Sequence, residues 1–185
     1  MTRTWLLKIL VGLLFFLYPV FIYFGLKEFQ PQLLAVYLLA IALLRLAVWR
    51  GRKVITPYWI VVPLIVVVVT VVTGSNFGLF LYPALVNLVF FSFFAISLFY
   101  PPTIVERFAR YNEPQLPAEA ISYTRKVTKV WCLFFLINGS LSLISLRMSE
   151  QWWLIYNGLI AYILMGALFA VEYLIRRRVM SKHHA

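Results

Sequence analysis

Long apolar runs separated by short polar or basic segments dominate the chain. A helix rises about 1.5 Å per residue, so about 20 apolar residues cross the ~30 Å of hydrocarbon in a bilayer. In lipid the backbone must satisfy its own hydrogen bonds, which favours helix even in Val-rich runs. The pattern therefore predicts an all-α fold, a polytopic membrane helix bundle with six transmembrane helices. The six runs, of 17 to 25 residues, are Ile9–Leu26, Pro31–Trp49, Pro57–Thr73, Leu79–Phe99, Val130–Leu146 and Gln151–Ile175.

The fourth and fifth runs are separated by the one long polar segment, residues 100–129. Pro101 and Pro102 end the fourth run, and Thr103 is suited to cap a short helix. Pro114 and Pro117 would end that helix, and a second helix is expected from Pro117 directly into the fifth run. The short helix is amphipathic, as in helices that lie on a bilayer surface. Its apolar stripe is Ile104, Val105 and Phe108, and its charged side is Glu106, Arg107 and Arg110. Residues 1–185 are thus expected to form a single transmembrane domain, in which residues 100–129 are a long cytoplasmic loop with an amphipathic helix.

Composition excludes an ordinary soluble domain. The chain is 63% hydrophobic and 12% charged, whereas soluble domains carry about 25% charged residues. Its net charge is +11, but the cations lie between apolar runs rather than on a folded basic face, so nucleic acid is not an expected partner. Cys132 is the only cysteine, so the chain has no internal disulfide.

The distribution of cations predicts the orientation. Only Lys27 and Arg147 fall on one side of the six runs, and Arg45 lies within a run. The cytoplasmic side collects the excess of Lys and Arg in membrane proteins, so both termini are expected in the cytoplasm. The first run could also be a cleaved signal peptide, but its length and the lack of a small-residue cleavage site favour a retained anchor. The other fourteen cations are Arg3, Lys8, Arg50, Arg52, Lys53, Arg107, Arg110, Arg125, Lys126, Lys129, Arg176, Arg177, Arg178 and Lys182.

Polar side chains at membrane depth are costly to bury and form a candidate intramembrane polar site. Two interpretations of the charged members remain open. Arg45 and Glu172 could pair between helices, or Arg45 could snorkel to the surface while Glu172 pairs with Arg176 one turn away. The neutral members could hydrogen-bond between helices or line a substrate path. The candidates are Arg45, Asn87, Asn138, Ser142, Asn157 and Glu172.

Basic residues of the loop and tail are the candidate contacts for anionic lipid headgroups or for an acidic partner such as an acyl carrier protein. No phosphate-binding loop, metal-ligand cluster or nucleophile–base arrangement is present, so no catalytic, cofactor or metal site is predicted and the chain is not expected to be an enzyme. His183 and His184 are expected in a solvated tail, and the tryptophans near run ends are expected to anchor at the bilayer interface. The candidate contacts are Arg107, Arg110, Arg125, Lys126, Lys129, Arg176, Arg177 and Arg178.

Residues 103–175 carry a series of short motifs: Ile104-Val105-Glu106-Arg107-Phe108, Gln115-Leu116-Pro117, Val130-Trp131-Cys132-Leu133-Phe134-Phe135, Asn138-Gly139, Trp152-Trp153 and Glu172-Tyr173-Leu174. This series resembles the bacterial intracellular septation protein A family of inner-membrane proteins. Ser142 stands where that family tends to have Asn. The chain is more similar to a sister group often encoded beside genes for aryl-polyene or fatty-acid-like lipids. The resemblance implies an accessory role in the envelope and identifies no catalytic residue.

The sequence therefore predicts a non-catalytic, multi-pass protein of the bacterial inner membrane that assists cell-envelope biogenesis or envelope lipid assembly. Its partners would be anionic lipids and envelope or lipid-synthesis proteins, and homo-oligomerisation stays open. The alternative is a small transporter or lipid flippase, with a polar path lined by Asn87, Asn138, Asn157 and Glu172.

Overall fold

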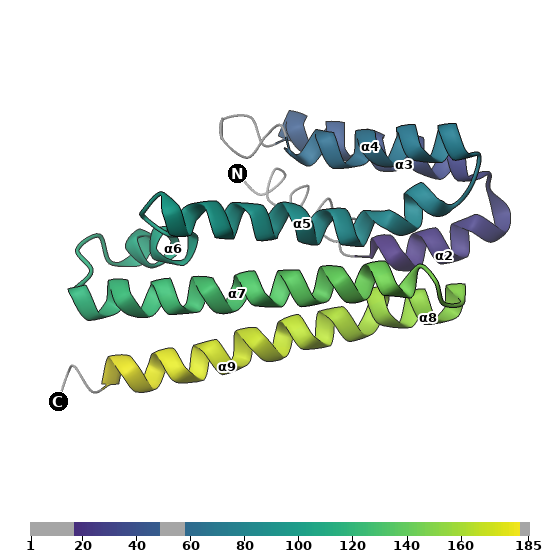
Figure 1. Cartoon of the computed structure of the whole chain (residues 1–185). Coiled ribbons are helices and arrows are strands. Elements are labelled where there is room, and N and C mark those ends of the chain that lie inside the picture. The colour runs from purple at the N-terminus through teal and green to yellow at the C-terminus, as the bar shows by residue number, and fades with distance from the viewer. Residues whose placement is uncertain (1–16, 49–57, 182–185) are drawn as a thin grey trace. The chain divides into compact units, whose positions relative to one another are not determined.

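The computed structural model describes residues 17–48 and 58–181, and within these ranges all regular structure is helical (Figure 1). This confirms the all-α prediction for the described residues. The elements in chain order are α2 (Tyr18–Glu28), α3 (Pro31–Val48), α4 (Tyr58–Thr73), α5 (Phe77–Phe99), α6 (Ile104–Asn112), α7 (Ala118–Ser145), α8 (Glu150–Ile155), the π-helical turn η1 (Tyr156–Ile160) and α9 (Ala161–Ser181).

Five of the predicted apolar runs match these helices closely. The second, third and fourth runs correspond to α3, α4 and α5, and the sixth corresponds to α8, η1 and α9 together. The fifth run lies within α7, which starts at Ala118 and so confirms one continuous helix after Pro117. Of the first run, the structure describes α2. The other predictions on residues 1–16, 49–57 and 182–185, including His183 and His184, lie outside the described residues.

Three helical segments are long and apolar enough to cross a membrane: Phe77–Phe99, Ala118–Ser145 and Glu150–Arg177. The apolar stretches described in α3 and α4, Pro31–Leu44 and Val61–Thr73, are shorter. A membrane protein is therefore supported. The count of six spans remains a prediction.

The chain divides into two compact units. Of the described residues, the first unit holds α2 to α4, the start of α5, the end of α7, α8 and the start of η1. The second unit holds the rest of α5, α6, α7 up to Asn138, and the chain from Leu159 onward, which includes α9.

In the first unit α3 packs along α4, and α2 contacts α3 and α8. The start of α5 approaches α4 very closely at Gly78. A Cβ atom built there would lie 2.3 Å from Thr70 Oγ1 and 2.7 Å from the Val66 carbonyl oxygen, so only glycine fits. Thr70 is fully buried, and its hydroxyl has no hydrogen-bond partner within the described chain. Gly74, between the two helices, has φ +60°, which glycine adopts without steric cost.

In the second unit α5 and α7 run antiparallel, and aromatic side chains of the two helices pair at intervals of one turn. Phe90 stacks on Phe135 with ring centroids 5.2 Å apart, and one turn further along α5 Phe94 lies 6.3 Å from Trp131. On its other side Trp131 contacts Phe169 of α9 at 4.5 Å. These contacts surround the buried cluster of Val127, Trp131 and Phe135. The core of this unit is therefore aromatic and centred on α7.

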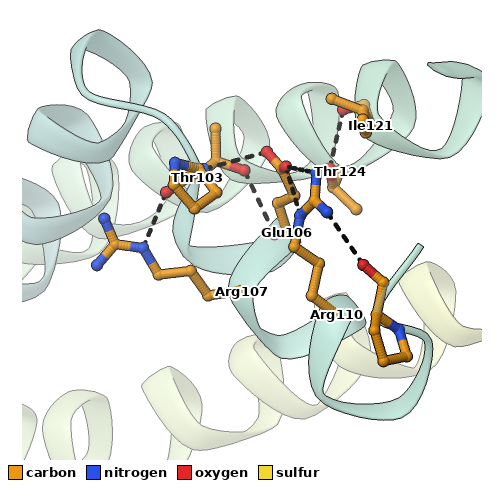
Figure 2. Close-up of polar contacts among 8 residues, drawn as sticks. Thr103, Glu106, Arg107, Arg110, Ile121 and Thr124 are labelled. Carbon is orange, nitrogen blue, oxygen red and sulfur yellow. Dashed lines mark hydrogen bonds and ion pairs between the residues drawn. The ribbon is translucent and has the colours of Figure 1, made fainter. Parts of the chain in front are cut away.

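α6 is held against the end of α5 and against α7. The Ile104 amide donates to Ser97 Oγ at 3.1 Å, and Val105 packs on the core cluster that contains Val127. Thr103 caps the helix as predicted, because its hydroxyl accepts from the Glu106 amide while the Glu106 carboxylate accepts from the Thr103 amide, both at 3.3 Å (Figure 2). This reciprocal arrangement is a capping box.

The structure shows that the predicted division of α6 into an apolar stripe and a charged side is wrong. Glu106 is only 5% exposed, whereas Phe108 is 71% and Tyr111 88% exposed. The predicted apolar stripe is thus divided, with Val105 directed to the core and Phe108 directed outward. The physical reason is that the capping box and an ion pair satisfy the Glu106 carboxylate, which removes most of the cost of burying it.

Candidate functional site

Ser142 of the fifth run and Asn157 of the sixth run, two of the predicted polar residues, meet in the first unit together with Ser145. Ser142 donates to Asn157 Oδ1, and Asn157 Nδ2 donates to Ser145 Oγ and to the Trp153 carbonyl, both at 3.0 Å. Ser145 Oγ in turn donates to the Ser142 carbonyl at 2.7 Å. Asn157, Ser142 and Ser145 are all buried. We call these three residues the Asn157 cluster.

The Asn157 cluster coincides with an irregular turn, because η1 starts at Tyr156. A π-helical turn displaces backbone groups from the regular α-helical pattern, and such turns are frequent at functional sites. Here the side-chain amide of Asn157 satisfies the Trp153 carbonyl one turn earlier. Both amide hydrogens of Asn157 are therefore used within the protein.

Asn87 and Asn138 form the corresponding contact in the second unit. Asn138 Nδ2 donates to Asn87 Oδ1 at 3.0 Å, and both side chains are buried. The contact joins α5 to α7, and the stacked pair Phe90 and Phe135 follows three residues away on each helix. Buried side-chain hydrogen bonds of this kind stabilise helix association by about 0.6 kcal/mol on average.

The charged candidates behave differently from the amides. Glu172 lies 3.7 Å from Arg176 Nε one turn later, which is one of the two predicted arrangements. Arg45 lies in α3, but its side chain is outside the described residues, so an Arg45–Glu172 pair stays a prediction. The Tyr123 hydroxyl donates to the Glu172 carbonyl at 3.3 Å and joins the start of α7 to the end of α9.

The predicted headgroup contacts gather at one end of the second unit. The start of α7 lies beside the end of α9, and α6 packs on the same part of α7. Arg177 lies over the Tyr173 ring at 5.8 Å, as Arg176 does at 5.7 Å, and both remain exposed. We call the exposed cations of this end the basic end; they are Arg107, Arg125, Lys126, Lys129, Arg176 and Arg177. The Arg178 side chain lies outside the described residues.

Arg110, another predicted headgroup contact, is half-buried and makes several contacts within the protein. Its Nη2 lies 2.8 Å from Glu106 Oε1, and its Nε donates to the same oxygen at 2.9 Å. Its Nη1 donates to the Pro114 carbonyl at 3.1 Å. All three nitrogens are engaged within the loop, so Arg110 holds α6 and the following turn together.

Two tryptophans that were expected at the bilayer interface are buried in the protein. Trp153 is 1% exposed, donates its indole N–H to the Phe80 carbonyl at 3.0 Å and packs on the Phe80 ring at 4.7 Å. Trp131 is also buried. The expected interfacial anchoring is therefore wrong for these two tryptophans, because a position near a run end does not distinguish a buried tryptophan from an interfacial one.

Within residues 17–48 and 58–181, no three side chains of the metal-binding types converge. Comparisons with protein-family models, with curated proteins and with solved structures found no match.

Proposed function

We propose that this chain is a non-catalytic bacterial inner-membrane protein that assists envelope biogenesis or envelope lipid assembly. In this proposal six helices span the membrane and both termini are cytoplasmic. The basic end faces the cytoplasm and contacts anionic headgroups or an acidic protein partner. The observation that carries the proposal is the gathering of exposed cations at one end of the second unit.

Electrostatics supports this role for the basic end. A cluster of cations beside a membrane surface attracts anionic lipid by about 1 kcal/mol per Lys or Arg. The six cations of the basic end outnumber the acidic residues near them: Glu106 is bound to Arg110, which is not one of the six, Glu172 lies near Arg176, and Glu113 and Glu119 are exposed. Lys126 and Lys129 are exposed and have no ion pair within the described chain.

The polar candidates support a scaffold more than a transporter. The amides of Asn87, Asn138 and Asn157 bind other protein groups, as expected of residues that fix helix packing. A transport path requires polar groups that can exchange their partners for substrate or water. The resemblance of residues 103–175 to the septation protein A family adds the envelope context to this proposal.

The proposal is tested by photo-crosslinking in intact bacterial cells. A crosslinking amino acid at Lys126 is expected to capture an enzyme of lipid or cell-wall synthesis, together with lipid. The same amino acid at Arg147, just after the opposite end of α7, is the control and is expected to capture no such enzyme. Recovery of lipid alone from position 126 would contradict a scaffolding role.

A further inference from the structure

α6 directs its acidic residue toward the protein and its aromatic residues outward. Glu106 is buried and bound to Arg110 on the protein side. The outward side consists of Arg107, Phe108 and Tyr111, and all three side chains are exposed. A helix on the surface of a soluble protein has the opposite arrangement. An aromatic outward side with one cation is typical of a helix that lies in the interface of a bilayer.

The attachment of α6 fixes its depth relative to a candidate span. Its first residue donates to Ser97 in the last two turns of α5, a helix long and apolar enough to cross a membrane. The end of α5 adds Phe99, 81% exposed, and Tyr100, 72% exposed, next to the same helix. Exposed aromatic residues at the end of a membrane helix lie at headgroup level.

The Arg107 guanidinium is oriented before any ligand binds. Its Nε donates to the Pro102 carbonyl at 2.9 Å, which leaves both terminal nitrogens without a partner in the described part of the chain. Figure 2 shows Arg107 and Arg110 extending to opposite sides of Glu106. Two parallel N–H donors match two oxygens of a phosphate group. Because one bond already restrains the side chain, less conformational entropy is lost on binding.

We infer that the outward side of α6 is a lipid-binding surface, in which Phe108 and Tyr111 insert at the bilayer interface and Arg107 binds the phosphate of an anionic phospholipid. This inference rests on the proposed function, since it requires α6 to lie on the cytoplasmic face of a membrane protein. A cation beside two exposed aromatic rings fits a ligand whose phosphate lies next to hydrocarbon, as in a phospholipid. A soluble acidic protein offers the charge but no hydrocarbon for the aromatic rings.

The first experiment measures the depth of the outward side. Phe108→Cys and Tyr111→Cys variants of the full chain carry a nitroxide in phosphatidylcholine–phosphatidylglycerol vesicles, and Glu119→Cys is the exposed control. We expect labels at 108 and 111 to be relaxed by oxygen and shielded from a nickel chelate, and the label at 119 to show the reverse. Cys132 is buried, so labelled wild-type chain gives the background. Nickel access at 108 and 111 equal to that at 119 would overturn the inference.

The second experiment tests the phosphate contact by native mass spectrometry of bound phosphatidylglycerol. We expect Arg107→Gln to reduce retention about threefold to tenfold relative to wild type, and Arg107→Lys to reduce it less. Arg147→Gln removes the same charge elsewhere and is expected to retain wild-type binding. Equal retention in Arg107→Gln and Arg147→Gln would refute the contact. Displacement of the lipid by added inorganic phosphate would assign the site to free phosphate instead.

Failure of this inference can be separated from failure of the proposed function. If the nitroxides lie in water while the crosslinker at Lys126 still captures an envelope enzyme, the lipid surface is wrong and the scaffold stands. If the nitroxides insert while the crosslinker recovers only lipid, the lipid surface stands and the scaffolding role is wrong.

Discussion

Both carboxylate oxygens of Glu106 are occupied, one by Arg110 and the other by the amide of Thr103. Glu106 thereby joins the start of α6 to Arg110 near its end, and Arg110 in turn binds the Pro114 carbonyl in the following turn. We predict that Glu106→Ala lowers the stability of α6 by about 1–3 kcal/mol, because it removes the capping box and leaves Arg110 without its anion. Hydrogen exchange of residues 104–112 measures the loss of protection. Glu113→Ala, an exposed acidic neighbour, is the control, and equal exchange in both variants would contradict the prediction.

The Asn157 cluster gives a second prediction for single residues. Ser142→Ala leaves the side-chain Oδ1 of Asn157 without its buried donor, and we expect a loss of stability of about 0.6–2 kcal/mol. Ser122→Ala is the matched control, since Ser122 lies exposed on the same helix. Unfolding of the purified protein in mixed detergent micelles measures both changes. If the two variants unfold alike, the cluster does not stabilise the association of these helices.

Sequence reasoning succeeded where spacing determines the contact. Glu172 and Arg176 are one turn apart, and Thr103 precedes a helix with Glu at its third position. It failed where the rotation of a helix about its axis mattered. Apolar side chains in a membrane protein face either lipid or the core, so hydropathy alone did not show that Glu106 is buried and Phe108 exposed.

At the scale of elements, the approach of α4 and α5 depends on the missing side chain of Gly78. Gly78→Ala would bring a methyl group to 2.7 Å from the backbone of Thr70 and Val66, which cannot rotate away as a side chain can. We predict a destabilisation of about 1–3 kcal/mol by overpacking. Gly166→Ala is the control, because a Cβ at Gly166 meets no atom within 4 Å. Unfolding in detergent compares the two, and an equal or smaller loss in Gly78→Ala would refute the close approach.

The extent of the helices was easier to predict than their contacts. Pro117 and the absence of any later break predicted that α7 continues into the fifth apolar run. Neither the π-helical turn at Tyr156 nor the contact of Gly78 with α4 could be predicted, because each depends on the partner helix. Trp153 was assigned to the interface from its position near a run end, while its indole bonds the Phe80 carbonyl in the core.

At the scale of the whole molecule, the number and direction of the spans can be tested with reporter fusions. We predict that a fluorescent protein fused after Ala185 is bright, because the proposed topology places the C-terminus in the cytoplasm. Alkaline phosphatase fused after Ser75 or Met148 is expected to be active, because both positions lie in periplasmic turns of the predicted topology. Phosphatase activity after Ala185 in intact cells would contradict the orientation and with it the cytoplasmic placement of the basic end.

The three candidate spans differ in how much of their surface the protein covers: α7 is the most enclosed and the segment ending at Arg177 the least. This asymmetry determines where mutations can accumulate. Exchanges among Leu, Ile, Val and Phe on the open sides of α9 alter little but a lipid contact, whereas the inward positions of α7 tolerate few replacements. Among distant descendants of this chain, the inward positions of α7 should thus stay recognisable after the sequence of α9 has drifted beyond comparison.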